Sequence, residues 1–116
     1  MRLFAFLVIF LSGHAWAVTD IEQGKALYIS PGKGGCATCH GQTGNEPIMA
    51  MYPKIGGQNE LYLYNQMVDF KNKKRRNGLF IPMEVAMISY SDNEIRLIAK
   101  YLSTNGLSTN GLSTGE

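Results

Sequence analysis

Two cysteines and a histidine lie within five consecutive residues, Cys36-Ala37-Thr38-Cys39-His40. This C-x-x-C-H spacing is typical of the attachment site of a c-type haem. The two thiols can add to the vinyl groups of one haem as thioethers, and the adjacent imidazole can then ligate the iron on one face. The motif therefore predicts one covalently attached haem c, bound through Cys36 and Cys39, with His40 as the proximal iron ligand.

The same cysteines allow two other interpretations. A disulfide between Cys36 and Cys39 would close a strained loop of two residues, would connect no distant segments and would leave His40 without a role. A thioredoxin-like redox pair is typical of a βαβ context, and the sequence shows no such pattern. Haem attachment explains all three residues, and we favour it for that reason.

The first residues have the pattern of an export signal. A positive start precedes a nearly continuous apolar stretch over 3–11, and Ala15-Trp16-Ala17 has the small-x-small pattern of a signal-peptidase site. Because the apolar stretch is too short for a comfortable membrane span, we predict a cleaved signal peptide over 1–17, with an uncleaved anchor as the alternative. Covalent haem attachment takes place outside the cytoplasm, so we predict a periplasmic protein without stable membrane insertion.

Cleavage would leave His40 as the only histidine, because His14 lies in the signal. A second histidine ligand is thereby excluded, and a methionine thioether is the expected distal donor. The remaining chain offers five methionines: Met49, Met51, Met67, Met83 and Met87. Loss of Arg2 would reduce the eleven basic side chains to ten, against nine acidic ones. So small a net charge argues against nucleic acid as a partner.

Apolar periodicity and capping signals predict three main helices. Their expected ranges are 19–29, 59 to about 73, and 91–102. Thr19 and Glu22 form a capping box at the start of the first helix, and Ser91 and Glu94 form one at the start of the last. We expect the middle helix to be the strongest, because its apolar residues Leu63, Met67 and Phe70 share one face. The other two helices also have apolar faces, formed by Ile21, Gly24 and Tyr28 in the first and by Ile95, Ile98 and Leu102 in the last.

Two segments between these helices are predicted to be loops. Residues 41–57 are rich in Gly, Pro and Asn, and we expect them to wrap around the cofactor. The second loop is expected over 82–90. It carries Met83 and Met87 and can cross the distal face of the iron.

A five-residue unit, Leu-Ser-Thr-Asn-Gly, begins at Leu102 and recurs to the end of the chain. Repeats rich in Ser, Thr, Asn and Gly bury no core. We therefore predict a single domain over 18–102, followed by a disordered low-complexity tail over 103–116.

Eight short segments follow one another in a recognisable order: Cys36–Gly41, Tyr52–Gln58, Tyr62-Leu63, Gln66-Met67, Phe70, Lys74-Arg75, Ser91-Asp92 and Ala99–Leu102. In this order and spacing, over about residues 20–102, the chain resembles the class I cytochromes c. It is most similar to the small bacterial periplasmic monohaem proteins and to single modules of their di-haem relatives. The resemblance implies an all-α class I cytochrome c fold, with three main helices and with loops wrapped around one covalently attached haem.

The resemblance also implies roles for single residues. The family's distal methionine stands nine positions before the aspartate of the Ser-Asp pair, which leads to Met83, with Met87 as the second choice. Arg75 matches the arginine that contacts a haem propionate, and a solvated surface charge is the alternative. A proline carbonyl orients the ligating histidine in the family, and Pro47 and Pro53 are both candidates.

Four further positions are compared with the family pattern. Lys73 stands where the family usually has glycine, and we expect it only to extend the helix. Tyr90 replaces a leucine. Gly24 and Tyr101 match the contact between the first and last helices, which is a structural role.

The predicted function is one-electron transfer by a protein that is not an enzyme. An iron with all six positions bound has no open position for a substrate, and it can change charge with little rearrangement. The partners would be a redox donor and a redox acceptor, and an acidic partner could be steered by the basic residues between 71 and 76. The alternatives are a haem c subunit of a larger oxidoreductase and a gas-binding or sensing haem protein with a labile distal ligand.

Overall fold

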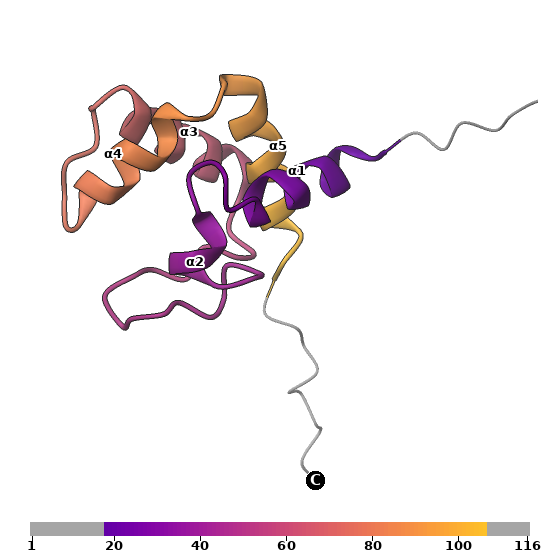
Figure 1. The fold of residues 1–116 in the computed structure, drawn as a ribbon, viewed down its shortest axis with the longest axis horizontal. Coiled ribbons are helices and arrows are strands. Elements are labelled where there is room, and N and C mark those ends of the chain that lie inside the picture. The colour runs from indigo at the N-terminus through magenta and orange to yellow at the C-terminus, as the bar shows by residue number, and fades with distance from the viewer. Residues whose placement is uncertain (1–17, 107–116) are drawn as a thin grey trace, which may run out of the picture.

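The computed structural model describes residues 18–106, so the predicted signal peptide and residues 107–116 of the predicted tail lie outside the described residues. All regular structure within the described part is helical: α1 Asp20–Ile29, α2 Cys36–His40, α3 Glu60–Lys71, α4 Phe80–Ile88 and α5 Asp92–Ser103. Figure 1 shows α1 crossing α5, with α3 and α4 on one side and α2 with its following loop below. The all-α class is confirmed. None of the helices over 18–106 is long and apolar enough to cross a bilayer.

The crossing of α1 and α5 depends on a glycine. A Cβ atom at Gly24 would lie 2.0 Å from the carbonyl oxygen of Leu97 and 3.0 Å from Cβ of Tyr101. The two backbones can therefore approach this closely only at a residue without a side chain. The predicted contact of Gly24 with Tyr101 is confirmed, and the predicted capping box of Thr19 and Glu22 is present at the start of α1.

The core lies between α1, α3, α4 and α5. Two of the three predicted apolar faces are its main contributors, and all members of these two are buried: Leu63, Met67 and Phe70 from α3, and Ile95, Ile98 and Leu102 from α5. On the first helix the predicted face is buried at Gly24 and Tyr28 but not at Ile21, which is 39 % exposed. Tyr28 from α1 and Met87 from α4 complete the contact between these faces. The amphipathic pattern of α3 and α5 thus predicted their buried sides correctly.

Lys73 does not extend α3, contrary to our expectation. The helix ends at Lys71, and Lys73 adopts a left-handed backbone with φ 60°. Its N–H donates to the carbonyl of Phe70 at 3.0 Å, and the N–H of Lys74 donates to the carbonyl of Asp69 at 2.8 Å. This pair of bonds is a Schellman motif, in which a left-handed residue, usually glycine, satisfies the last helix carbonyls.

The segment over 82–90, predicted to be a loop, contains the helix α4. Pro82 is the third residue of this helix. The first four N–H groups of a helix have no intrahelical acceptor, so a proline there sacrifices no hydrogen bond. The prediction of three main helices is thus incomplete, because α4 and the short α2 are also helical.

Only half of the predicted second capping box forms. The hydroxyl of Ser91 accepts a hydrogen bond from the N–H of Glu94 at 3.1 Å. The Glu94 carboxylate instead makes an ion pair with Lys33, which lies in the loop between α1 and α2. Glu94 therefore fastens the segment that leads into the cysteine motif to the start of α5.

The first copy of the five-residue repeat belongs to the fold. Helix α5 continues through Ser103. The Asn105 side chain donates to the backbone carbonyl of Thr43 at 3.1 Å. The backbone carbonyl of Asn105 accepts a hydrogen bond from the Asn45 side chain at 2.7 Å. The folded unit therefore extends past the boundary predicted at Leu102.

Replacement of Gly24 by alanine should weaken the α1–α5 contact. We expect Gly24→Ala to lower the free energy of unfolding of the haem-loaded protein by about 1–3 kcal/mol or more, because the new methyl group overlaps the Leu97 carbonyl. Gly32→Ala is the control, since its nearest neighbouring atom is 4.0 Å away, and it should change stability by less than about 0.5 kcal/mol. Denaturant titration compares the two, and equal stabilities would contradict the close-approach argument.

Candidate functional site

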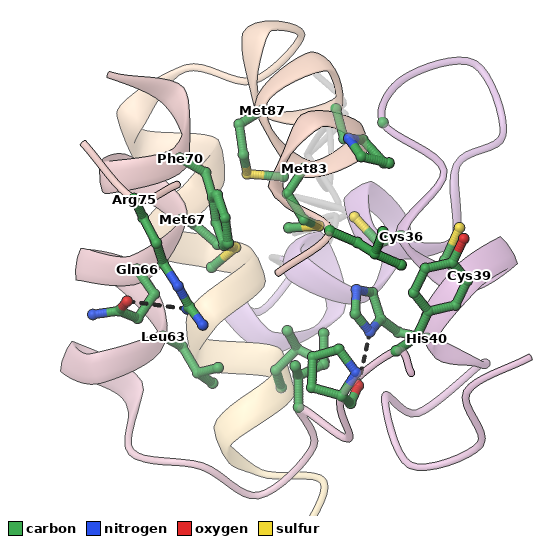
Figure 2. A pocket seen from close by; sticks show the side chains of 18 of the residues that line it. Cys36, Cys39, His40, Leu63, Gln66, Met67, Phe70, Arg75, Met83 and Met87 are labelled. Atoms are coloured by element: carbon green, nitrogen blue, oxygen red, sulfur yellow. Dashed lines mark hydrogen bonds between the residues drawn. The ribbon is translucent and has the colours of Figure 1, made fainter. Parts of the chain in front are cut away.

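A cavity of about 380 Å³ lies between α2, α3, α4 and the loop that precedes α3. This volume is within the range of roughly 300–1,000 Å³ that is usual for ligand pockets. The predicted haem-binding residues and two apolar faces line it together (Figure 2): Cys36, Cys39 and His40 from α2, Leu63, Met67 and Phe70 from α3, and Met83 and Met87 from α4. Residues separated by up to 51 positions in the sequence therefore meet at one site.

The short helix α2 explains why the cysteines share one wall of the cavity. Residues three apart on a helix lie on the same side, and Cys36 and Cys39 are so spaced on α2. Gly35 precedes the helix with φ 68°, a backbone that glycine adopts without strain. Both cysteines are free thiols, which argues against the disulfide alternative. Burial raises the pKa of the Cys36 thiol.

The imidazole of His40 is oriented by a backbone carbonyl. Nδ1 lies 2.9 Å from the carbonyl oxygen of Pro53, drawn as a dashed line in Figure 2. A carbonyl can only accept, so Nδ1 carries the proton and the lone pair of Nε2 is left for a metal. Burial lowers the pKa of His40, which favours the neutral imidazole that metals bind. Of the two candidate prolines, Pro53 therefore makes this contact.

Arg75 lies at the cavity rather than in open solvent. Its guanidinium donates to the side chain of Gln66 at 3.0 Å and to that of Asn77 at 3.0 Å. It also lies over the ring of Phe70, at 4.7 Å from the ring centroid. Figure 2 shows Arg75, Gln66 and Phe70 together beside the cavity. These contacts fix a positive charge at the cavity wall.

The two candidate distal methionines occupy different environments on α4. They are four residues apart, so both are on the side of the helix that meets the cavity. Met87 is 1 % exposed and is part of the hydrophobic core. Met83 is half-buried and packs only against the edge of that core. Of the other methionines, Met67 is a core residue and Met51 is exposed.

The sequence pattern did not predict the hydrogen bonds of two tyrosine hydroxyls near the site. The Tyr28 hydroxyl donates to the carbonyl of Gly41 at 2.6 Å, and the Tyr101 hydroxyl donates to the carbonyl of Gln42 at 3.0 Å. These bonds hold the backbone directly after the motif against α1 and α5. The Tyr101 bond joins residues 59 positions apart, so no local signal could have predicted it.

The donors at the cavity fit a covalently attached haem c. Two free thiols and a correctly protonated imidazole come from α2, and thioether side chains come from α4. The remaining walls are largely apolar, which suits the face of a porphyrin and excludes water from it.

Known proteins resemble this chain over most of its length. The family described as Cytochrome c matches residues 21–106. Cytochrome c4 of Pseudomonas aeruginosa is 35 % identical over 98 residues, which cover 84 % of this chain and 44 % of that protein. The cytochrome subunit of sulfide dehydrogenase of Chlorobaculum tepidum is 34 % identical over 80 residues, which cover 69 % of this chain and 64 % of that protein.

A solved structure shares the same fold. The structure of reduced recombinant cytochrome c4 from Pseudomonas stutzeri superimposes with a TM-score of 0.64 at 27 % sequence identity, covering 74 % of this chain and 48 % of that one. The chain thus spans less than half the length of these cytochrome c4 proteins.

Proposed function

Because this chain belongs to the cytochrome c family, whose cofactor is covalently bound haem c, we propose that it is a periplasmic one-electron carrier. The bound haem supplies an iron that gains or loses one electron. The observation that carries the proposal is the convergence of Cys36, Cys39, His40 and Met83 on one apolar cavity. The export pattern of residues 1–17 supports the periplasmic location.

Each of these side chains has a defined task in the proposal. Cys36 and Cys39 bind the haem through thioethers, so the cofactor cannot dissociate. His40 ligates the iron through Nε2, since its Nδ1 proton is donated to Pro53. The apolar faces of α3 and α4 keep water from the iron, which limits the solvent rearrangement that accompanies each change of charge.

Met83 is the proposed distal ligand. A ligand must project into the cavity, and Met83 lies at the edge of the core whereas Met87 is enclosed by it. Because a thioether is a weak donor to Fe(III), this ligand favours a high reduction potential. Arg75, held at the cavity wall by Gln66 and Asn77, is proposed to neutralise a haem propionate.

Replacement of the two methionines distinguishes their roles. We expect Met83→Ala to abolish the iron–methionine charge-transfer band, to lower the reduction potential, and to let the reduced protein bind carbon monoxide. Met87→Ala should keep the band and lose about 2–5 kcal/mol of stability, as for a buried methionine. Visible spectroscopy of both redox states and denaturant titration measure these effects.

Loss of the charge-transfer band in Met87→Ala, with the band kept in Met83→Ala, would identify Met87 as the ligand. Binding of carbon monoxide by the unaltered reduced protein at neutral pH would contradict a firmly ligated carrier and would favour a gas-binding or sensing protein.

The partners are proposed to be redox proteins, with an acidic docking surface on at least one of them. Ion pairs occupy two of the basic residues between 71 and 76 that would steer such a partner. Lys71 pairs with Asp92, and Arg76 lies 3.5 Å from Glu84. Lys73 and Lys74 are exposed and have no ion pair within residues 18–106. Their charges are therefore the most available for guiding a transient encounter.

Charge reversal tests this docking surface. We expect Lys73→Glu combined with Lys74→Glu to slow electron transfer to a small acidic redox protein by roughly tenfold at low ionic strength, with a smaller effect at high salt. Lys25→Glu, an exposed change on α1, is the control and should have little effect. Stopped-flow rates at several salt concentrations are the measurement, and a rate independent of both salt and variant would remove the proposed docking role.

One observation favours a second function, that of a haem c subunit in a larger oxidoreductase. The outer side of α4 exposes a row of apolar side chains: Ile81 is 62 % exposed, Val85 62 % and Ile88 67 %. Such a row is unusual on a freely diffusing protein and is typical of a covered surface. The likeness to the cytochrome subunit of sulfide dehydrogenase agrees with this alternative.

Native size separates the two functions. If the protein is a free carrier, we expect it to elute from an extract of native cells at the size of one chain, because no partner covers α4. The two changes Ile81→Glu and Val85→Glu should then leave the elution size unchanged. Elution with a larger protein, abolished by these two changes but not by Lys25→Glu, would support the subunit instead. Size-exclusion chromatography with haem absorbance is the measurement.

A further inference from the structure

The start of α4 is packed less deeply than its end. Met87, near the end of this helix, is 1 % exposed and belongs to the core, whereas Met83 packs only against the edge of that core. No side chain caps the first turn of α4, although α1, α3 and α5 are capped by Thr19, Asn59 and Ser91. The proposed distal ligand therefore lies on the uncapped and shallowly packed part of α4.

The turn that leads into α4 has little packing of its own. Every residue over 72–79 is exposed except Arg75, which is half-buried. Arg75 is fastened to α3 and to the turn itself, not to α4. Within residues 18–106, the one ion pair between this turn and α4 is that of Arg76 with Glu84, at 3.5 Å from Nε to Oε1. The position of the turn beside α4 thus depends on this pair.

The Glu84 carboxylate in turn depends on Arg76. The Glu84 side chain is 15 % exposed, and its Oε1 atom is buried without a hydrogen-bond partner in the part of the chain that the structure describes. A buried carboxylate is costly to leave unpaired. The positive charge of Arg76 therefore favours the arrangement in which the turn and the start of α4 stay together.

This ion pair lies next to two proposed haem contacts. Arg76 follows Arg75, the proposed propionate partner, and Glu84 follows Met83, the proposed iron ligand. Arg75 and Met83 line the cavity, whereas Arg76 and Glu84 lie outside its lining. The pair therefore joins, from outside the cavity, the two segments whose neighbouring residues would hold the haem. Separation of α4 from the turn would carry Met83 away from the iron.

We propose that Glu84 is a positioning residue for the distal iron ligand, and that it acts by holding the start of α4 against the turn through Arg76. This rests on the proposed function, because it assumes that Met83 ligates the iron. The pair limits the fraction of molecules in which the thioether has left the iron. An external ligand binds only to that fraction, so its apparent affinity is proportional to the fraction.

Imidazole binding to the oxidised haem protein tests the proposal. Imidazole supplies a nitrogen ligand that displaces the thioether, and loss of the iron–methionine charge-transfer band measures its binding at fixed pH and ionic strength. The variants are Arg76→Gln, Glu84→Gln and the two combined. Asp92→Asn is the matched control, because the pair of Lys71 with Asp92 also joins a half-buried and an exposed side chain. That pair links α3 to α5 and includes no neighbour of a proposed iron ligand.

We expect each single change to lower the apparent dissociation constant of imidazole about fivefold, which corresponds to about 1 kcal/mol. The combined variant should show about the same fivefold change, because both changes remove one and the same pair. Asp92→Asn should alter the constant by less than about twofold. Arg76 is 60 % exposed, so its replacement leaves a protein that folds around its haem.

Three results would overturn the proposal. The first is an unchanged affinity in one or both single variants. The second is a fivefold change in Asp92→Asn, because the ion pairs would then loosen the whole fold rather than position the ligand. The third is a combined effect equal to the product of the two single effects, since the two residues would then act separately. An unaltered protein without the charge-transfer band would instead contradict methionine ligation, and with it the proposed function.

Discussion

The rest of the structure depends on one apolar cavity, because the helices do not close on one another where α2, α3 and α4 meet. Filled only with water, a space of about 380 Å³ would leave its largely apolar lining without packing partners. A domain is stable by only roughly 5–15 kcal/mol, so packing lost on this scale affects the whole fold. The side chains around it therefore require a large apolar occupant, and covalent haem c meets that requirement and brings the redox chemistry with it.

The contacts around this cavity explain how a small protein can hold an iron still. The carbonyl of Pro53 fixes the ring of His40, and the hydroxyls of Tyr28 and Tyr101 hold the two residues that follow it. The close crossing at Gly24 keeps α1 against α5 beneath them. An electron carrier benefits from such restraint, because its iron changes charge without a large movement of the ligands. The exposed side of α4 and the charges of Lys73 and Lys74 are the surfaces proposed to contact other proteins.

Three predictions failed because the meaning of a local signal depends on its position or on a neighbour in space. The sequence predicts Pro82 in a loop, although a proline in the first turn of a helix removes no hydrogen bond. Lys73 was expected to prolong α3, yet it takes the left-handed conformation that ends the helix. Glu94 forms an ion pair with Lys33 in place of its expected backbone contact. In each case a neighbour in space or an exact position in the helix decided the outcome.

The sequence by itself determined the class of cofactor, the residues proposed to hold it, the buried faces of α3 and α5, and the contact at Gly24, because these depend on short spacings and helical periodicity. Only the tertiary structure decided which proline orients His40, that Gln66 holds Arg75, and that the hydroxyl of Tyr101 bonds to the backbone after the motif. The physical reason is that these contacts join residues 9 to 59 positions apart. Such contacts exist only once the helices have packed, and no local pattern encodes their distances.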